Sequence, residues 1–569
     1  MAPGKIITIS ATPDPNALPD PDEVHLNEWY NQDFDGYRIT EQPIYTRRPM
    51  RMICVGAGAA GLQIAYKAER GLKDVELQIY EKNSDIGGTW LENRYPGCTC
   101  DIPSHSYQFT WARNPNWSRF YSPSEEIWRY FKDVATKFDL EKYVKLNTTV
   151  ESATWDEEAG LWRVTLLGHD GKHFEDTCDI LINGSGLLNS WKYPDIPGVD
   201  LFKGKMMHSA KWDHSYDLSG KTVAVVGGGS SAVQIVPSIQ PANDTIVVAK
   251  LIPFLRSPVW ITTDQIKEFL AEPEKYTKYC RDIEGELNKR FTLMHLKAKD
   301  QKASRDLVTD IMSEQLGQDP FLTKKMIPEF ALGCRRMTPG SGYLQSLRAD
   351  NVQVVTESAV RLTEKGIVDE SGVEHEVDVV VCATGFDTSF SPHFKVTGRT
   401  GVTIQDQFGD FPQGYLGIMA ENFPNFFLLP GPNSPTSHSS LLPILEWYTR
   451  YIFQIIDKLQ TENIKGIEPK ARAIKEYYNH THELMKRLVW SSPCRSWFKN
   501  GKIHGPVTAI YPGSRLHFFE MMKNVRWEDF EITYKTDNRY QFMGNGYTMT
   551  EMSVDGDPVW YFDDPFTKI

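Results

Sequence analysis

Two glycine-rich turns are the residues of this chain whose types and spacing point most directly to chemistry. The first is Gly56-Ala57-Gly58-Ala59-Ala60-Gly61, and the second is Gly227-Gly228-Gly229-Ser230-Ser231-Ala232. Each turn follows a short apolar run and precedes a helical pattern. In that context glycine lets backbone amides approach a pyrophosphate at a helix N-terminus. The two turns therefore predict two dinucleotide sites, with two purely structural turns as the alternative.

The residue at the end of the next strand distinguishes the two sites. Glu81 stands 20 residues after Gly61, where a carboxylate accepts hydrogen bonds from a ribose diol. In the second unit the apolar run 245–249 is expected to be the strand, and it ends in Lys250. A lysine pairs with a 2′-phosphate, which a carboxylate would repel. We therefore expect NADP rather than NAD at the second site, unless Lys250 is an ordinary solvated surface lysine.

Two further patterns carry a family resemblance. The linker between the turns reads Phe202-x-Gly204-x-x-x-His208-x-x-x-Trp212-Asp213, and an earlier segment reads Gly87-Gly88-Thr89-Trp90, then Tyr95-Pro96-Gly97 and Asp101. Taken singly, His208 is typical of a buried histidine, and Trp90 and Trp212 are typical of a core. Together the patterns resemble the fingerprints of type I Baeyer–Villiger monooxygenases, over nearly all of the chain from about residue 50.

This resemblance implies an enzyme that uses FAD, NADPH and molecular oxygen. In the family, NADPH reduces the flavin, the reduced flavin adds oxygen at C4a, and the resulting peroxyflavin attacks a ketone carbonyl. The product is an ester or lactone, and the second oxygen atom leaves as water. The implied partners are a ketone and oxygen.

The resemblance also implies which residues do this chemistry. Arg336 matches the catalytic arginine, Arg335 the neighbour that reaches the NADP phosphate, and Asp101 the carboxylate that orients Arg336. A fixed guanidinium suits the negative charge that develops on oxygen. Without the resemblance, two adjacent arginines are most often a solvated pair.

Other positions are carried over from the same resemblance. Flavin contacts are implied for Thr89, Trp90, Asp101, Tyr107, Thr384 and Gly385, a pocket-lining loop for Pro435 to Leu441, and an NADP contact for Trp497. The pocket loop could equally be an ordinary turn, and Trp497 could be a loop anchor. The glycine-rich stretch 337–343 departs from the family pattern and leaves the substrate scope open.

The elements that must position these residues predict an α/β fold. It consists of two Rossmann-like dinucleotide-binding domains, the second inserted in the first, plus a helical lobe. The apolar runs 179–186 and 377–386 end alike, so we expect the chain to leave the first domain near 190 and return near 378. The expected parts are an N-terminal arm at 1–45, the FAD-binding domain at 46–189 and 378–569, and the NADP-binding domain at 190–377 with a helical insertion at 264–330.

Several shorter elements follow from periodicity. Apolar residues at three- and four-residue spacing predict a helix over 124–138. Alternation predicts a hairpin at 148–167, and further helices are expected at about 440–460 and 468–488. Aromatic residues between 29 and 45 predict that the second half of the arm docks on the body.

Composition limits the class of protein. The net charge of −12 argues against nucleic-acid binding, which needs a basic surface. There is no apolar run long enough for a transmembrane helix and no signal-peptide pattern at the start. The eight cysteines are scattered and are expected to be reduced thiols of a cytoplasmic protein. We expect no metal site, and the sequence says nothing about oligomeric state.

Three rival functions remain open. A flavin monooxygenase that oxidises nitrogen or sulfur in small molecules would share both turns and most of the linker. A flavin disulfide reductase would need a redox pair, for which Cys98 and Cys100 are the only close cysteines. A non-catalytic flavoprotein would bind cofactor without consuming NADPH in response to a ketone.

Overall fold

The computed structural model describes residues 27–240, 248–262, 273–437 and 440–563. The first parallel sheet has the order β18-β7-β1-β2-β3. Its strands are β1 (Met50–Val55), β2 (Val75–Tyr80), β3 (Val144–Lys145), β7 (Ile180–Asn183) and β18 (Phe426–Leu428). β1 and β7 are almost wholly buried, as expected for parallel strands covered on both faces.

The second parallel sheet has the order β10-β9-β16-β8. Its strands are β8 (Lys205–His208), β9 (Thr222–Val226), β10 (Lys250–Phe254) and β16 (Val379–Cys382). α1 (Ala59–Gly71) follows β1, and α4 (Ser230–Ile239) follows β9, so each glycine turn joins a strand to a helix. The expected fold class, two Rossmann-like units in an α/β chain, is confirmed.

The second sheet lies within the chain interval between two strands of the first. The chain leaves the first sheet after β7 and returns to it at β18. The expected return at residue 378 is wrong, because β16 pairs with β8 and β9 in the second sheet. The apolar ends of β7 and β16 look alike since each is a central strand of its own sheet.

The start of β10 also differs from expectation. The strand expected at 245–249 falls partly on 245–247, which lie outside the described residues, and Val248 and Ala249 precede the strand. β10 begins at Lys250, where it was expected to end. Pro253 inside β10 hides the strand pattern because proline is uncommon within sheets.

Smaller sheets complete the strands. A four-stranded sheet contains β4 (Thr149–Asp156), β5 (Leu161–Leu167), β6 (His173–Cys178) and β17 (Lys395–Thr397). The others contain β13 (Ala359–Leu362), β14 (Gly366–Asp369) and β15 (Glu374–Glu376), the pair β19 (Ile464–Pro469) and β20 (Phe530–Tyr534), and the pair β11 (Ile261–Thr262) and β12 (Thr338–Pro339). The antiparallel pairing of β4 with β5 confirms the expected hairpin.

The helices expected at 124–138, about 440–460 and 468–488 are present as α3, α10 and α11. The helices near the first sheet are α2 (Thr89–Glu92), α3 (Ser124–Lys137), α10 (Leu441–Thr461), α11 (Ala471–Met485) and α12 (Arg515–Met521). Short helices elsewhere are α8 (Tyr343–Ser346), α9 (Ile404–Phe408) and α13 (Met549–Met552). α10 packs on α1, which joins the C-terminal part of the chain to the first unit. No helix in the described part of the chain is both long and apolar enough to cross a membrane.

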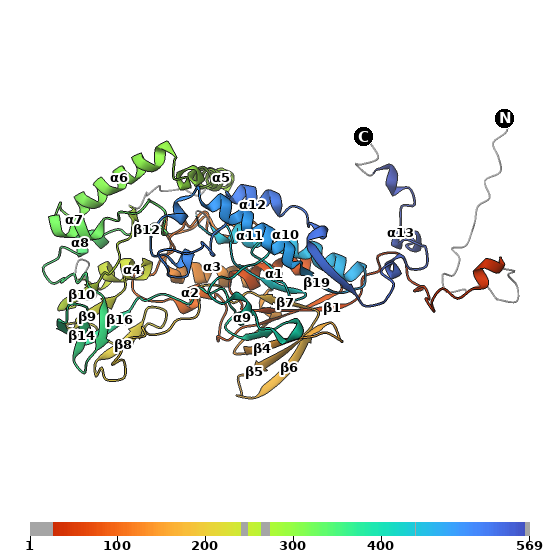
Figure 1. Cartoon of the computed structure of the whole chain (residues 1–569), viewed down its shortest axis with the longest axis horizontal. Helices are drawn as coiled ribbons and strands as arrows, with labels where there is room; N and C mark the ends of the chain where they lie inside the picture. The colour runs from red at the N-terminus through yellow and green to blue at the C-terminus, as the bar shows by residue number, and fades with distance from the viewer. Residues whose placement is uncertain (1–26, 241–247, 263–272, 438–439, 564–569) are drawn as a thin grey trace.

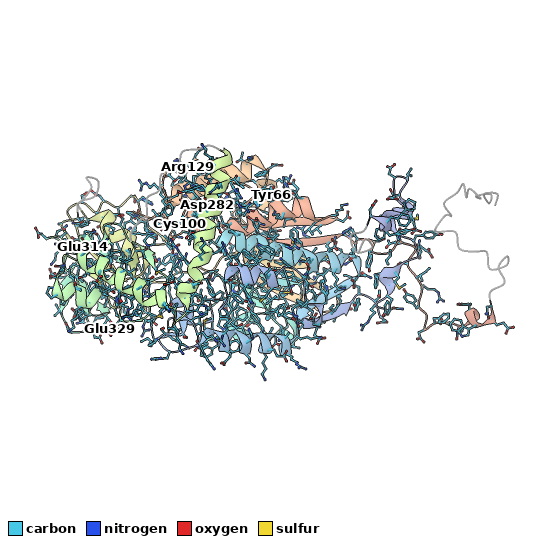
Figure 2. The ribbon with its side chains drawn as sticks, turned by 90° about the horizontal axis from the view of Figure 1, so that it is seen from above. Tyr66, Cys100, Arg129, Asp282, Glu314 and Glu329 are labelled. Atoms are coloured by element: carbon cyan, nitrogen blue, oxygen red, sulfur yellow. A yellow bond between two sulfur atoms is a disulfide. The ribbon has the colours of Figure 1, made fainter. Side chains whose placement is uncertain are left out.

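The expected helical insertion is present as α5 (Pro273–Lys289), α6 (Lys299–Gln315) and α7 (Pro320–Met326). Residues 264–272 of the expected range lie outside the described part. The lobe lies toward the end of the molecule that holds the second sheet (Figure 1). Figure 2 shows Glu314 of α6 and Glu329 near that end, while Tyr66 of α1 lies toward the other.

The N-terminal arm meets the C-terminal segment rather than the main body. Ile44 N–H donates to Tyr547 O at 2.8 Å, and the Tyr45 ring stacks on Phe542 at 5.2 Å. Trp29 stays 58 % exposed and Phe34 47 % exposed. The expected docking on the body is therefore wrong for these aromatic residues: Tyr45 packs on the C-terminal segment, and Trp29 and Phe34 stay largely exposed. Both segments extend together from one end of the molecule (Figure 1).

One pair of cysteines contradicts the expectation of reduced thiols. Cys334 and Cys494, which are 160 residues apart in sequence, form a disulfide. The other six cysteines are free and buried. Sequence spacing did not predict the pair because the fold brings two distant loops together.

A close approach at Gly97 joins the two units. Gly97 has φ +76°, and a Cβ built there would lie 2.1 Å from Ser238 Oγ and 2.6 Å from Gln234 O of α4. Gln234 Nε2 also donates to Thr99 O at 3.1 Å, and its Oε1 accepts from Tyr95 OH at 2.8 Å. The Tyr95-Pro96-Gly97 segment therefore seats the second unit against the first.

We predict that Gly97→Ala lowers the midpoint of thermal unfolding. The left-handed backbone costs an alanine about 1–2 kcal/mol, and the clash with α4 adds about 1–3 kcal/mol. Gly171→Ala is the matched control, because Gly171 has φ +73° but nothing within 4 Å of its built Cβ. Equal shifts in the two variants, measured by differential scanning calorimetry, would contradict the proposed close packing.

Candidate functional site

One large cavity lies where the two glycine turns face each other. Its volume is about 870 Å³. Residues of both units line it, including Gly58 of the first turn, Gly227 to Ser231 of the second, Asp101, Arg336 and Trp497. The volume and the mixed apolar and charged lining suit an extended ligand held between the units.

The first turn has the geometry that a pyrophosphate needs. Gly56 has φ +99°, and a built Cβ would lie 2.9 Å from Gly184 O. A Cβ on Gly61 would lie 2.3 Å from Gly56 O, so helix α1 packs directly on the turn. Ala59 and Ala60 at the start of α1 line the cavity. A side chain at Gly56 or Gly61 would break this cradle.

Glu81 lies beside the turn but does not line the cavity. It is only 4 % exposed, and its carboxylate accepts from Ala57 N–H at 2.8 Å and from Asn83 N–H at 2.9 Å. Burial raises its pKa, while these two backbone donors oppose the rise. Because a carboxylate has further lone pairs, contact with a ribose stays a prediction.

Aromatic side chains form one wall of the cavity. Trp90 Nε1 donates to Tyr107 OH at 3.1 Å, and both rings line the cavity next to Thr89. Burial raises the pKa of Tyr107 well above its usual value, so its hydroxyl stays protonated. This wall offers flat apolar surface with its polar groups already paired, which suits a planar ring system.

The structure brings Arg336 and Asp101 together at the cavity. Arg336 Nη2 donates to Asp101 Oδ1 at 2.9 Å, Nε donates to the other carboxylate oxygen, and Nη1 donates to Thr436 O at 3.0 Å. Burial opposes the charge on the arginine, but Asp101 outweighs burial and raises the pKa of Arg336. The guanidinium is therefore held permanently charged and in one orientation.

Arg335 lies on the second unit's side of the cavity and has a different environment. Its Nη1 donates to Pro258 O at 3.2 Å. Burial and the nearby charge of Arg256 lower the pKa of Arg335 to about 10. Within the described residues neither Arg335 nor Arg256 forms a salt bridge, whereas Arg336 does. Arg335 and Arg256 both line the cavity. Two such guanidinium groups side by side are a site for an anion such as phosphate.

The role expected for Lys250 does not fit its position. In the register of β10 and β9, Lys250 pairs with Thr222 and Phe254 pairs with Val226, the residue before Gly227. Lys250 is thus about 16 Å along the strand from the glycine turn, which begins five residues after Thr222. It is exposed and does not line the cavity. The strand position that matches Glu81 is Leu255, and Arg256 directly follows it.

Arg256 is therefore a site residue that sequence reasoning missed. The signal was available in the run Phe254-Leu255-Arg256-Ser257, but the strand had been expected to end at Lys250. Arg495, which also lines the cavity, was missed as well. No sequence pattern predicted Arg495, since tertiary packing alone brings its loop to the site.

The linker motif 202–213 supports the site from outside. None of Phe202, Gly204, His208, Trp212 and Asp213 lines the cavity. His208 is wholly buried at the end of β8, pairs with Cys382 of β16 and stacks on Trp191 at 4.7 Å. Burial lowers the pKa of His208 to about 4, so the ring is neutral near pH 7. The motif anchors β8. The neighbouring strand β16 leads directly to Thr384 and Gly385, which line the cavity.

Some of the remaining expected residues line the cavity and others lie outside it. Thr384, Gly385, Leu441 and Trp497 line the cavity, as do Gly227, Gly229, Ser230 and Ser231. Ala232 is buried where α4 packs on its sheet. Pro435 is wrongly assigned to the pocket: it is buried in its loop, and Thr436 lines the cavity instead. Residues 438 and 439 of that loop lie outside the described part. No cluster of potential metal ligands occurs within the described ranges.

Comparisons with known proteins agree with this geometry. The model of the flavin-binding monooxygenase-like family matches residues 49–397. The chain is 39 % identical to the FAD-binding monooxygenase tazF of Aspergillus terreus, over 91 % of this chain and 95 % of that protein. It is 32 % identical to a Baeyer-Villiger monooxygenase of Pseudomonas aeruginosa, over 85 % and 92 %.

A solved structure gives the same picture. The crystal structure of cyclohexanone monooxygenase from Rhodococcus sp. Phi1 bound to NADP+ superposes with a TM-score of 0.74 at 25 % identity. The match covers 86 % of this chain and all of that one.

We predict that Arg256 pairs with the 2′-phosphate of NADPH, so that Arg256→Ala weakens NADPH binding about 10- to 100-fold. NADH binding should change little, since NADH lacks that phosphate. Lys250→Ala is the matched control and should leave both affinities unchanged. Titration of the purified protein with each nucleotide measures the effect; a loss in the Lys250 variant but not the Arg256 variant would refute the assignment.

Proposed function

Because the chain belongs to the flavin-binding monooxygenase-like family, we propose that it catalyses Baeyer–Villiger oxidation. In this proposal it inserts one oxygen atom next to a ketone carbonyl and gives an ester or lactone. Its substrates are then a ketone and molecular oxygen. The fixed Arg336–Asp101 pair at the cavity is the observation that carries the proposal.

The cofactors are FAD and NADP, as in the family and its solved relatives. We assign FAD to the turn at Gly56–Gly61 with the Trp90 and Tyr107 wall, and NADPH to the turn at 227–232 with Arg256 and Arg335. When bound, the flavin accepts hydride from NADPH and activates oxygen. The residues of the chain then have to orient the ketone, exclude water and stabilise charge.

Arg336 meets the need for charge stabilisation. Attack on a carbonyl places negative charge on oxygen, and a preorganised cation in a cavity of low polarity stabilises that charge strongly. Asp101 holds two of the guanidinium nitrogens and Thr436 O holds the third, so the orientation is set before any substrate arrives. A guanidinium is suitable because it cannot lose its proton to an anionic oxidant.

Oxidation of nitrogen or sulfur in small molecules is the alternative within the same family. That chemistry transfers oxygen to a lone pair and creates no carbonyl-derived anion, so it has no need for the Arg336–Asp101 pair. The purified yellow holoenzyme should be given NADPH with linear, cyclic and polycyclic ketones and with a thioether. Mass spectrometry of the products distinguishes ester formation from sulfoxide formation, and a thioether product without any ester would support the alternative.

Arg336→Ala should retain FAD and lose ester formation by about 100- to 1,000-fold, the usual effect of removing one oxyanion-stabilising group. Arg336→Lys should recover part of the rate, because it keeps the charge but not the two-point contact with Asp101. Gas chromatography of the ester, with flavin content from the visible spectrum, measures both. Near wild-type ester formation in the alanine variant would refute the role of Arg336.

Arg335→Ala is the matched control for this experiment. It removes a neighbouring guanidinium that has no carboxylate partner among the described residues. It should raise the KM for NADPH while ester formed per NADPH consumed stays close to wild type. A similar loss of ester per NADPH in both variants would mean that the two arginines do not have separate tasks.

Asp101→Asn should lower ester formation about 10- to 100-fold, because Arg336 loses its charged two-point partner and its fixed orientation. If Asp101 acts only through Arg336, the double variant Asp101→Asn/Arg336→Ala should be no slower than Arg336→Ala alone. The initial rates of the wild type, the two single variants and the double variant form a double-mutant cycle. Fully additive losses would show that Asp101 acts independently of Arg336.

A further inference from the structure

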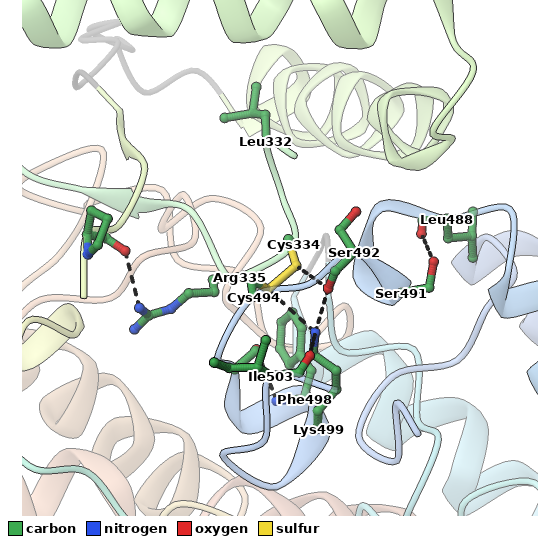
Figure 3. Close-up of a disulfide and its surroundings, with 12 residues drawn as sticks. Leu332, Cys334, Arg335, Leu488, Ser491, Ser492, Cys494, Phe498, Lys499 and Ile503 are labelled. Carbon is green, nitrogen blue, oxygen red and sulfur yellow. Dashed lines mark hydrogen bonds between the residues drawn. A yellow bond between two sulfur atoms is a disulfide. The ribbon is translucent and has the colours of Figure 1, made fainter. Parts of the chain in front are cut away.

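The disulfide lies directly beside the cationic part of the cavity. Cys334 immediately precedes Arg335 and Arg336, and Cys494 immediately precedes Arg495, with Trp497 two residues further on. The two cysteine Cα atoms are 6.4 Å apart. Both arginine-bearing segments line the same cavity. Figure 3 shows the disulfide joining the segment that carries Arg335 to the loop that carries Phe498 and Lys499.

The cross-link joins two segments that carry arginines of the cavity wall. Arg256, Arg335 and Arg495 line the cavity, and none of them forms a salt bridge within the described residues. The Arg495 side chain has one hydrogen bond there, to Gly501 O of its own loop at 3.1 Å. Four arginines and the three carboxylates Asp101, Asp195 and Glu357 line the cavity, so positive charge exceeds negative charge by one and favours binding of an anion. The disulfide, which is next in sequence to both Arg335 and Arg495, keeps their two segments together.

The loop after Cys494 is itself closed around a buried lysine. Lys499 is only 2 % exposed, and its Nζ donates to Ser492 O at 2.6 Å and to Ile503 O at 3.0 Å. Cys494 Sγ lies 3.8 Å from the same nitrogen (Figure 3). Segment 492–503 is thus one closed unit, and the disulfide attaches it to Cys334. Cys334 is wholly buried and Cys494 is 2 % exposed, so the bond is shielded from solvent.

We propose that the Cys334–Cys494 disulfide is a positioning device for NADP binding. It holds Arg495 and Trp497 against the segment of Arg335, so that the cationic face of the cavity is assembled before the dinucleotide phosphates arrive. Preorganisation of this kind raises affinity by removing the cost of ordering the loop on binding. The inference rests on the assignment of NADP to the second turn, and not on the choice between ketone and thioether oxidation.

The first test is the bond itself. A proteolytic digest of the unreduced holoenzyme should contain the peptide with Cys334 joined to the peptide with Cys494, and reduction should add two hydrogen atoms in separating them. The absence of the joined peptide in protein purified with free thiols blocked would overturn the proposal.

The second test compares variants of the holoenzyme. Cys334→Ala/Cys494→Ala should weaken NADP+ binding about tenfold, measured by calorimetry without substrate. Trypsin should cut after Arg495 about tenfold faster, because the released loop samples open states. KM for NADPH should rise more than kcat falls. Cys178→Ala is the matched control, since it removes a buried sulfur from β6 and should change none of these values.

The outcomes separate positioning from simple stabilisation. A lower unfolding temperature with unchanged NADP+ affinity and unchanged cleavage after Arg495 would overturn the proposal, because any cross-link can stabilise a fold. If the double variant does not fold, the wild-type holoenzyme is reduced with dithiothreitol. The reagent forms its cyclic disulfide and passes two electrons and two protons to Cys334 and Cys494. The same two measurements then apply, and neither depends on which product the enzyme makes.

Discussion

The ion pair between Arg336 and Asp101 is the contact on which the arrangement of the site depends. Its partners are 235 residues apart in sequence and belong to segments that follow different glycine turns. Removing a guanidinium from water costs several kcal/mol, and only a well-oriented carboxylate offsets that cost. The two units must therefore keep one relative placement. The close approach of Gly97 to α4 and the hydrogen bonds of Gln234 supply that placement.

The cavity lining carries a positive charge, whereas the whole chain is negatively charged. The whole protein has a net charge of −12, yet Arg256, Arg335, Arg336 and Arg495 all line the cavity. Asp101, Asp195 and Glu357 line it as well, so the four arginines leave a local excess of one positive charge. The whole-chain charge is the basis for expecting no nucleic-acid partner, but the local field decides which small anions the cavity attracts.

The disulfide adds a covalent constraint to this electrostatic arrangement. It joins the loop of Arg495 and Trp497 to the segment of Arg335 and Arg336. Its presence also removes the cysteine-based argument for a cytoplasmic location, which assumed that all eight cysteines are reduced. In our proposal the ion pair and the cross-link together order one side of the cavity before a ligand binds.

Local patterns in the sequence determined the two glycine turns, the helices around 124–138 and 440–460, and the pairing of Arg336 with Asp101 through a family resemblance. The turns and helices could be predicted because a tight turn or an apolar face is a property of a few neighbouring residues. The pairing of Arg336 with Asp101, which are 235 residues apart, came from the family resemblance alone. Only the tertiary structure decided that β16 belongs to the second sheet, that Arg256 rather than Lys250 faces the cavity, and that Cys334 meets Cys494. Strand register and contacts between distant loops depend on how whole elements pack, and a shift of a few residues moves a side chain to the other end of a strand.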